Sequence, residues 1–318
     1  MVAAKRPHLE DDDRDAQRPR CVLSDPLLPD VVDRFRSHLD LEVCPPGPAL
    51  DAALDTADAL IVLLSVTVDD ALLDKAPRLR VVGNYAVGVD NIDLEACRRR
   101  GVAVVNTPDV LTHSTAELAL TLLLSVARRV GEGERLVRTG GWKGWAPTQL
   151  LGTELRGKRA VVVGPGRIGE ATAELFSALG LMVTRIGRHD PAPRVRSLLE
   201  EADVLSLHLP LSSATRHWLD ADRLAHLKDG AIVINTARGG VIDEPALIAE
   251  LVSGRLRAGL DVYDDEPAVP EALWSLDNVV LLPHLGSATR TAREGMATKV
   301  LDGVTAVLLG ETPENRVA

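Results

Sequence analysis

Cysteine, aromatic residues and net positive charge are all scarce in this chain. Its 318 residues include 3 cysteines and 3% aromatic residues, and 36 Lys and Arg stand against 46 Asp and Glu, a net charge of −10. Cys21, Cys44 and Cys97 are widely spaced and form no C-x-x-C, which favours reduced thiols over a disulfide framework or a metal site. The acidic balance argues against nucleic-acid partners. An anionic ligand therefore needs specific arginines.

Long apolar runs and common hydrolase motifs are missing too. The most apolar stretch, residues 118–127, is about half as long as a membrane span requires. The charged N-terminus has no apolar core and does not resemble a secretory signal. H-E-x-x-H, G-x-S-x-G and G-x-x-x-x-G-K-[ST] are absent, which disfavours zinc hydrolysis, serine hydrolysis and P-loop phosphoryl transfer. We expect a cytoplasmic protein without a membrane partner. Residues 1–19 are predicted to form a flexible acidic tail.

The rest of the sequence alternates strand-like and helix-like segments. Strand-like runs are at residues 20–23, 59–64, 79–83 and 102–105, with amphipathic patterns at 29–39, 69–75 and 93–100 between them. A second series begins at Lys158 and continues with strands at 182–186, 204–207, 231–235, 258–262 and 279–282. This alternation predicts an α/β fold with two parallel sheets, the second of them doubly wound.

Two longer helices are predicted outside these series. One covers residues 114–138 and is apolar on nearly every face between 118 and 127, so we expect it to be buried all round. Packing against a second subunit and burial between two domains would both explain such a helix. The other, residues 289–309, follows the last strand and could return to the first domain.

The strand that opens the second series ends in a glycine-rich loop. Its apolar residues lead into a G-x-G-x-x-G at Gly164, Gly166 and Gly169, and a helical pattern follows. In a dinucleotide site the first glycine allows the turn, the second lets pyrophosphate approach and the third allows close helix–strand packing. The pyrophosphate then lies on the N–H groups of the helix N-terminus.

The next strand ends in Gly187 and Arg188, where an NAD enzyme usually carries an acidic residue. An arginine there suits a 2′-phosphate, and Arg167 in the glycine-rich loop adds positive charge. We therefore predict NADP(H) as the preferred cofactor and NAD(H) as the alternative. A solvent-facing Arg188 that leaves the enzyme indifferent to the phosphate is the competing interpretation.

Three side chains suited to carbonyl reduction follow the last three strands. They are Arg238, Glu266 and His284, and parallel strands bring such residues to one edge of the sheet. Arg238 can bind and polarise a 2-oxo acid, while His284 can donate a proton as hydride arrives. Glu266 can orient the imidazole and keep it protonated. Asp261 is placed to accept a hydrogen bond from the nicotinamide amide. Each residue alone is more typical of solvated surface, but their shared position favours a site.

The chain resembles the D-isomer-specific 2-hydroxyacid dehydrogenases from about Arg20 onward, and among them most resembles the glyoxylate/hydroxypyruvate reductases. The resemblance rests on residues 84–93, 106–112, 164–169, 235–239, 261–267 and 283–289. It implies a discontinuous, flavodoxin-like substrate-binding domain (residues 20–108 and 288–318) and a Rossmann cofactor domain (109–287). The active site would lie in the cleft between them, with hinges near Pro108 and Gly286.

The resemblance also assigns roles to individual residues. The family's catalytic Arg, Glu and His match Arg238, Glu266 and His284. Residues matched to the cofactor site are Thr112, Gly164, Gly166, Arg167, Ile168, Gly169, Gly187, Arg188, Leu209, Pro210, Thr215, Thr236, Ala237, Asp261, His284 and Gly286. Residues matched to the substrate site are Leu64, Ser65, Ala86, Val87, Gly88, Arg238 and, from the neighbouring subunit of a homodimer, Trp145. A tryptophan that only packs the dimer interface is the alternative for Trp145.

These residues imply an NADPH-dependent reductase of small 2-oxo acids, glyoxylate and hydroxypyruvate, with no metal. Two alternatives remain open from sequence. One is a dehydrogenase of another D-2-hydroxy acid or of phosphite. The other is a non-catalytic NAD(H)-sensing protein that resembles corepressors built on this fold, although the absence of a basic patch weighs against it.

Overall fold

The chain folds into two compact units in a computed structural model that describes residues 18–318. Unit 1 comprises the described residues up to Thr107 together with Ala297–Ala318, and unit 2 comprises Pro108–Met296. Each unit is built on a parallel sheet with helices, so the predicted α/β fold class is confirmed. The predicted tail at residues 1–19 lies outside the described residues, except for its last two.

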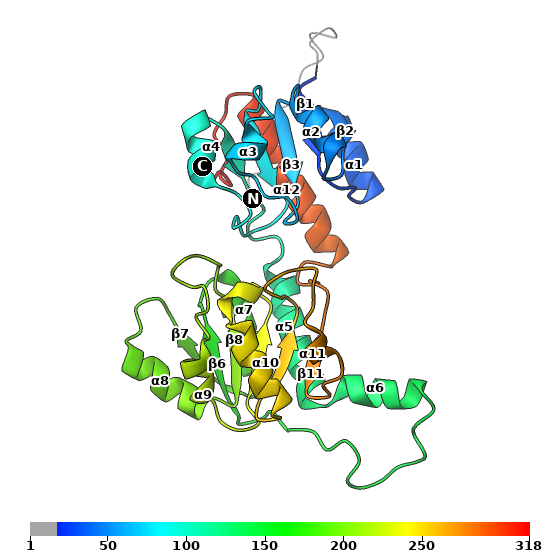
Figure 1. Ribbon diagram of the computed structural model, residues 1–318, viewed down its shortest axis with the longest axis vertical. Helices are drawn as coiled ribbons and strands as arrows, with labels where there is room; N and C mark the ends of the chain where they lie inside the picture. Colours follow the sequence, from blue (N-terminus) through cyan, green and yellow to red (C-terminus); the bar gives the residue numbers. More distant parts are fainter. Residues whose placement is uncertain (1–17) are drawn as a thin grey trace, which may run out of the picture. The chain divides into compact units, whose positions relative to one another are not determined.

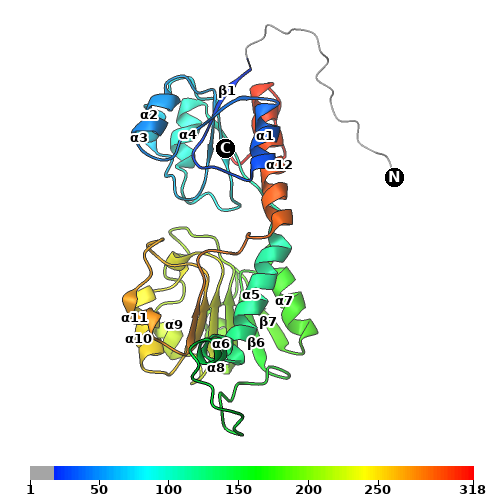
Figure 2. The same ribbon diagram turned by 90° about the vertical axis from the view of Figure 1, so that its right-hand side faces the viewer.

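Unit 1 contains a parallel sheet in the order β2-β1-β3-β4-β5, which is the flavodoxin-like order. Its strands are β1 (Arg20–Leu23), β2 (Asp40–Val43), β3 (Ala59–Val62), β4 (Val81–Asn84) and β5 (Ala103–Val105). Its helices are α1 (Pro29–Arg36), α2 (Pro48–Leu54), α3 (Asp70–Leu73), α4 (Leu94–Arg100) and the second half of α12 (Arg290–Leu308). Figure 2 shows α1 and α12 on one face of this sheet and α2, α3 and α4 on the other.

The C-terminal residues complete unit 1. A Cβ added to Gly83 in β4 would lie only 2.6 Å from Val300 Cγ2, so α12 packs directly on the sheet backbone. The chain end then runs along the outer strand β5, where Val104 N donates to Ala318 O (3.0 Å) and Val317 N donates to Val104 O (2.8 Å). This pairing covers one edge of the sheet.

Unit 2 contains a parallel sheet in the order β11-β10-β9-β8-β6-β7 (Figure 1). Its strands are β6 (Arg159–Val163), β7 (Met182–Ile186), β8 (Val204–Leu207), β9 (Ile232–Asn235), β10 (Arg257–Leu260) and β11 (Val279–Leu281). Its helical segments are α5 (Thr112–Ala127), α6 (Val130–Arg138), α7 (Arg167–Ala178), α8 (Ala192–Glu201), α9 (Ala221–Ala225), η1 (Gly239–Val241), α10 (Glu244–Val252) and α11 (Glu271–Trp274).

Two apolar layers cover the sheet of unit 2. Residues of α5 and α7, such as Leu122, Leu123 and Phe176, form one layer. Residues of α8 and α10, such as Leu199 and Leu247, contribute to the other. Figure 2 shows α5 and α7 on one face and α9, α10 and α11 on the opposite face. Because both faces are buried, the central strands read as continuous apolar runs in the sequence.

Two predictions about the order of elements were incomplete or wrong. Strand β2 and helix α2 were not predicted, because β2 is a partly exposed edge strand whose Asp40 and Glu42 break any apolar run. The single helix predicted over 114–138 is two helices, since Arg129 between them takes a left-handed conformation (φ 54°) that no helix interior can contain.

The expectation that this helix is buried all round stays a prediction, because the single chain covers only one side of it. Leu122, Leu123 and Val126 of α5 are buried against the sheet and α7, but Thr121 is exposed and Leu124 only partly covered. Within one chain, α5 therefore has a covered side and a side that its own unit leaves partly open.

The observed unit boundary differs slightly from the predicted one. The return to the first domain was placed at residue 288, whereas the division lies inside α12. The first turns of α12 still belong to unit 2, where a Cβ on Gly295 would lie 3.0 Å from Val110 Cβ.

Across residues 18–318, no helix is both long enough and apolar enough to cross a membrane.

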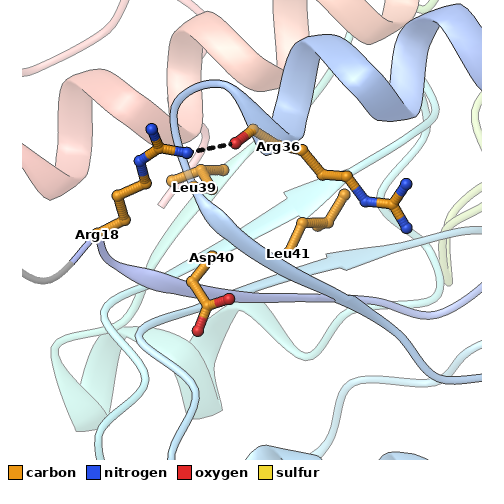
Figure 3. Close-up of a pocket in the computed structure, with 5 residues that line it drawn as sticks. All are labelled: Arg18, Arg36, Leu39, Asp40 and Leu41. Atoms are coloured by element: carbon orange, nitrogen blue, oxygen red, sulfur yellow. Dashed lines mark hydrogen bonds between the residues drawn. The ribbon is translucent and has the colours of Figure 1, made fainter.

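An open hollow lies beside the edge strand β2 of unit 1 (Figure 3). It is lined by Arg18, Arg36, Leu39, Asp40 and Leu41. Arg18 Nη1 donates to the backbone oxygen of Arg36 at 2.8 Å, so this guanidinium is already engaged by the protein. No residue predicted for the functional site lines the hollow, and we do not assign it a role.

Candidate active site

The glycine-rich loop after β6 has the geometry that its sequence predicts. Gly164 has φ +86°, and a Cβ there would lie 2.6 Å from the backbone oxygen of His208. A Cβ on Gly169 would lie 2.2 Å from the backbone oxygen of Gly164, so only glycine lets α7 approach the strand this closely. Gly166 is the N-cap of α7 and offers no side chain to the first-turn N–H groups. These donors are therefore left for an anion.

The loop lies where the strand order of the sheet reverses. The chain continues from β6 to β7 on one side and then returns to β8 on the other. At the end of β8, His208 N donates to Val163 O (2.8 Å), which ties this end to the glycine-rich loop. In open α/β sheets this reversal point is where a dinucleotide binds.

His208 was not identified from the sequence. Its Nε2 lies 2.8 Å from Ser206 Oγ, and burial lowers the pKa of its imidazole to about 4, so it is neutral at physiological pH. Leu209 and Pro210 follow it directly. Thr215 Oγ1 accepts from Ser212 N (2.9 Å) and donates to Pro210 O (2.5 Å), so this predicted cofactor residue also closes its own loop.

The turn after β9 carries Arg238 and is shaped by Asn235, which was not predicted as a site residue. Asn235 Oδ1 accepts from Ala237 N (3.0 Å), and its Nδ2 donates to Arg238 O (2.9 Å). Arg238 Nη1 donates to Ala237 O (2.8 Å). Thr236 is only 8% exposed, and its hydroxyl is one of the buried polar atoms among residues 18–318 without a hydrogen-bond partner.

Glu266 and His284 meet at the ends of β10 and β11. His284 Nδ1 lies 2.7 Å from Glu266 Oε2, and Glu266 Oε1 accepts from Tyr263 N (3.1 Å). Burial raises the pKa of the Glu266 carboxyl, but His284, the Tyr263 N–H and Arg238 lower it, and the net pKa is below its ordinary value. The carboxylate is therefore ionised near neutral pH.

The backbone at His284 is left-handed (φ 54°) and is held by Asp261. His284 N donates to Asp261 O (2.9 Å), while the two carboxylate oxygens of Asp261 accept from Leu285 N (2.6 Å) and Gly286 N (2.9 Å). Asp261 is 1% exposed, and burial raises the pKa of its carboxyl above the ordinary value. Asp261 thus fixes the turn that presents His284, a contact that the sequence could not show. Its predicted bond to a nicotinamide amide stays a prediction.

The turns that carry Arg238 and Glu266 are in direct backbone contact. A Cβ on Gly239 would lie 1.9 Å from the carbonyl carbon of Tyr263. Beside it, Arg216 Nη2 pairs with Asp264 Oδ2 at 3.3 Å, and a Cβ on Gly240 would lie 2.9 Å from Asp264 Oδ1. The relative position of the two catalytic candidates is therefore set by backbone packing.

The other residues predicted for the cofactor also belong to unit 2. Arg188 at the end of β7 is exposed, and Arg167 Nε lies 2.5 Å from Asp109 Oδ1, which offsets part of its charge. Thr112 begins α5, whose first turn reaches the His284 loop because Thr115 Oγ1 donates to Gly286 O (3.0 Å).

Residues predicted for the substrate belong mostly to unit 1 and lie after β3 and β4. Asn106 Nδ2 donates to Val87 O (2.7 Å), and Asn84 Nδ2 donates to Gly88 O (2.6 Å). A trans peptide points its N–H opposite to its C=O, so the N–H of Gly88 points away from Asn106. Leu64 is partly buried and Ser65 is exposed. Trp145 belongs to unit 2 and is 83% exposed.

A nicotinamide dinucleotide fits the residues of unit 2. The open first turn of α7 suits pyrophosphate, and the glycine cradle has no room for larger side chains at Gly164 and Gly169. Thr236 lies between the end of β9 and Arg238, and its buried hydroxyl has no hydrogen-bond partner. A polar atom of a bound ligand could form that hydrogen bond. Among residues 18–318, no cluster of His, Cys, Asp and Glu is arranged to hold a metal ion.

A dinucleotide loop on one parallel sheet, with Arg, Glu and His at its last strand ends, is typical of a dehydrogenase. Comparison with known proteins gives the family. The model of the D-isomer specific 2-hydroxyacid dehydrogenase NAD-binding domain matches residues 120–286. The chain belongs to this family and is an NAD(P)-dependent oxidoreductase that acts on a CH–OH group.

Its relatives include glyoxylate reductases. It is 44% identical to a glyoxylate reductase of Thermococcus litoralis over 86% of this chain and 87% of that one. A solved protein of Thermus thermophilus has a TM-score of 0.88 and 43% identity, covering 94% of this chain and 100% of the other. An NADPH-dependent glyoxylate/hydroxypyruvate reductase of Sinorhizobium meliloti, solved with NADP and malonate, has a TM-score of 0.85 and 33% identity over 95% and 97% of the chains.

Proposed function

We propose that this enzyme reduces glyoxylate and hydroxypyruvate to 2-hydroxy acids, with NADPH as the preferred cofactor and His284 as the proton donor. The observation that carries the proposal is the 2.7 Å contact between His284 Nδ1 and Glu266 Oε2. The names of the relatives support the substrate class, since many of them are glyoxylate reductases.

His284 donates the proton in this proposal, and Glu266 orients the imidazole. A protonated imidazole carries hydrogen on both nitrogens, and its Nδ1–H donates a hydrogen bond to the Glu266 carboxylate. The Nε2–H is then available to the oxygen of the substrate carbonyl as that oxygen becomes an alkoxide. The bound nicotinamide supplies the hydride that reduces the carbonyl carbon.

Arg238 binds and polarises the substrate in this proposal. The side-chain oxygen and nitrogen of Asn235 both bind the backbone of this turn, so the backbone that carries the Arg238 guanidinium is fixed. A guanidinium can donate two parallel hydrogen bonds to a 2-oxo acid, which orients the carbonyl toward His284. Arg238 also contributes to lowering the pKa of the Glu266 carboxyl.

Other residues proposed for the substrate belong to unit 1. We propose that backbone N–H groups of Ala86, Val87 and Gly88 bind the substrate carboxylate, with Leu64 and Ser65 at the same pocket. The asparagine contacts to Val87 O and Gly88 O support this role because they fix the peptide planes of the loop.

A homodimer would complete the site with Trp145 of the neighbouring subunit. The high exposure of this indole and the partly open side of α5 support the proposal. An indole that only packs the interface is the competing role. Light scattering at micromolar concentration tests the dimer, and a monomer mass would contradict it.

Preference for NADPH rests on the end of β7. Gly187 carries no acid to bind ribose hydroxyls or to repel a 2′-phosphate, and the exposed Arg188 beside it offers two donors.

A cytoplasmic location stays a prediction from sequence.

A panel of 2-oxo acids, followed at 340 nm with NADPH and with NADH, tests the proposal. We expect turnover of glyoxylate and hydroxypyruvate, and less of longer acids. Faster turnover of a bulky acid, or oxidation of phosphite, would favour the alternative dehydrogenases. Cofactor binding without turnover of any acid would favour the NAD(H)-sensing protein.

A further inference from the structure

The carboxylate of Asp190 lies beside Gly187, although the sequence has no acid at position 187. Asp190 Oδ2 accepts from Gly187 N at 2.7 Å. A Cβ added to Gly187 would lie 3.8 Å from that same oxygen and 3.7 Å from Pro165 Cγ in the glycine-rich loop. The carboxylate is thus next to the place where an acidic side chain at position 187 would begin.

Asp190 also engages a second arginine. Arg194 in the first turns of α8 places its Nε 2.7 Å from Asp190 Oδ1. The Asp190 side chain is 23% exposed and that of Arg194 is 51% exposed. Both oxygens of Asp190 are therefore committed, one to the backbone of Gly187 and one to Arg194, and the acid is the more enclosed partner.

We infer that Asp190 and Arg194 form a charge pair that limits how strongly the end of β7 attracts a 2′-phosphate. The inference rests on the proposed function, because it assumes that the cofactor ribose lies at the end of β7, as in other sheets of this type. Asp190 opposes the phosphate by its own charge and holds the Arg194 guanidinium that would otherwise assist Arg188. A negative charge, absent at position 187, is thus present three residues further along the chain.

The test measures dissociation constants of NADPH and NADH by cofactor fluorescence, without turnover. Asp190→Asn keeps an oxygen that can accept from Gly187 N while it removes the charge. We expect the Kd of NADPH to fall at least about threefold, with little change for NADH, because only the 2′-phosphate feels the lost charge. The gain should shrink in high salt.

A matched control is available on the same helix. Glu200 pairs with Arg196 at 2.8 Å in the same i, i+4 class of ion pair, further along α8. Glu200→Gln removes one negative charge as Asp190→Asn does, and we expect it to leave both dissociation constants unchanged.

Arg194→Gln provides the opposite perturbation. It leaves Asp190 without its counter-ion, so NADPH should bind more weakly while NADH is unaffected. In Asp190→Asn/Arg194→Gln both charges are gone, and the ratio of the two Kd values should return toward that of the wild type. The double variant separates an effect of charge from an effect of loop geometry.

The outcomes are distinct. An unchanged Kd for NADPH in Asp190→Asn, or equally weaker binding of both cofactors, would overturn the inference. Asp190 would then only stabilise the loop through its contact with Gly187 N. Equal Kd values of both cofactors in the wild type would contradict the proposed NADPH preference, while the change in Asp190→Asn still decides the inference. A wild type that binds neither cofactor would contradict both.

Discussion

Gly239 and Tyr263 lie so close that a single methyl group cannot fit between them. A Cβ on Gly239 would be 1.9 Å from the carbonyl carbon and 2.1 Å from the carbonyl oxygen of Tyr263. Arg238 precedes this contact, and Glu266 follows the other side of it by three residues. Two turns from neighbouring strands are thereby held in one arrangement.

Gly239→Ala should therefore damage both stability and activity. The added methyl group meets backbone, which cannot move aside as a flexible side chain would, so we expect a loss of about 1–3 kcal/mol or more in unfolding free energy. Thermal unfolding and kcat/KM measure the two effects. Gly131→Ala in α6 is the control, because nothing lies within 4 Å of its Cβ, and it should be neutral or stabilising. Equal effects of both changes would contradict the packing argument.

Glu266→Gln should move the alkaline limb of the reduction pH profile to lower pH. The protonated imidazole is the active form for reduction, and the variant removes the carboxylate charge that stabilises it at 2.7 Å. The pH dependence of kcat/KM for glyoxylate measures this shift. An unmoved limb would show that the Glu266 carboxylate does not set this limb of the profile.

The same substitution should change stability in a pH-dependent way. The pKa of Glu266 is lowered in the folded protein, so its stabilising effect is present above the ordinary carboxyl pKa, about 4.3, and is lost as pH falls through the folded value. The difference in Tm between wild type and variant should therefore narrow on acidification. A constant difference would point to packing alone.

Trp145→Ala should raise the ratio of kcat/KM for longer 2-oxo acids over glyoxylate, because an indole in the substrate pocket narrows it. Trp142→Ala is the matched control, since Trp142 lies in the same loop and is 53% exposed. If the two variants behave alike, Trp145 does not line the site.

Cofactor preference gives a prediction at the end of β7. We expect kcat/KM for NADPH to exceed that for NADH by at least about tenfold, which requires only ~1.4 kcal/mol. Arg188→Ala should remove most of this preference. Gly187→Asp should invert it by repulsion of the 2′-phosphate. Equal efficiencies in the wild type would contradict the argument.

The predictable parts of the fold were those with a strong local signal. Strand β8 was placed to the residue because a buried parallel strand is a continuous apolar run. Strand β7 was also placed to the residue, although it is a partly exposed edge strand that contains Arg185. Strand β2 has no such apolar run, and the helix breaks at Arg129 itself, whereas the nearby Gly131 and Gly133 lie within α6.

The site divides in the same way. Arg238, Glu266 and His284 could be found because strand ends in a parallel sheet share one edge, and the contact of Glu266 with His284 follows from that rule. The hold of Asp261 on Leu285 and Gly286, and that of Asp190 on Gly187, depend on turn geometry. No spacing in the sequence specifies which N–H a carboxylate will accept.

The central claim is that His284 donates the proton, and His284→Asn tests it most directly. Asparagine tolerates the left-handed backbone at this position better than alanine, so the loop should keep its shape. The measurement is kcat for glyoxylate reduction together with the Kd of NADPH. The account predicts a fall of about 10²–10⁴ in kcat with the Kd nearly unchanged. A variant that retains the wild-type kcat would contradict it.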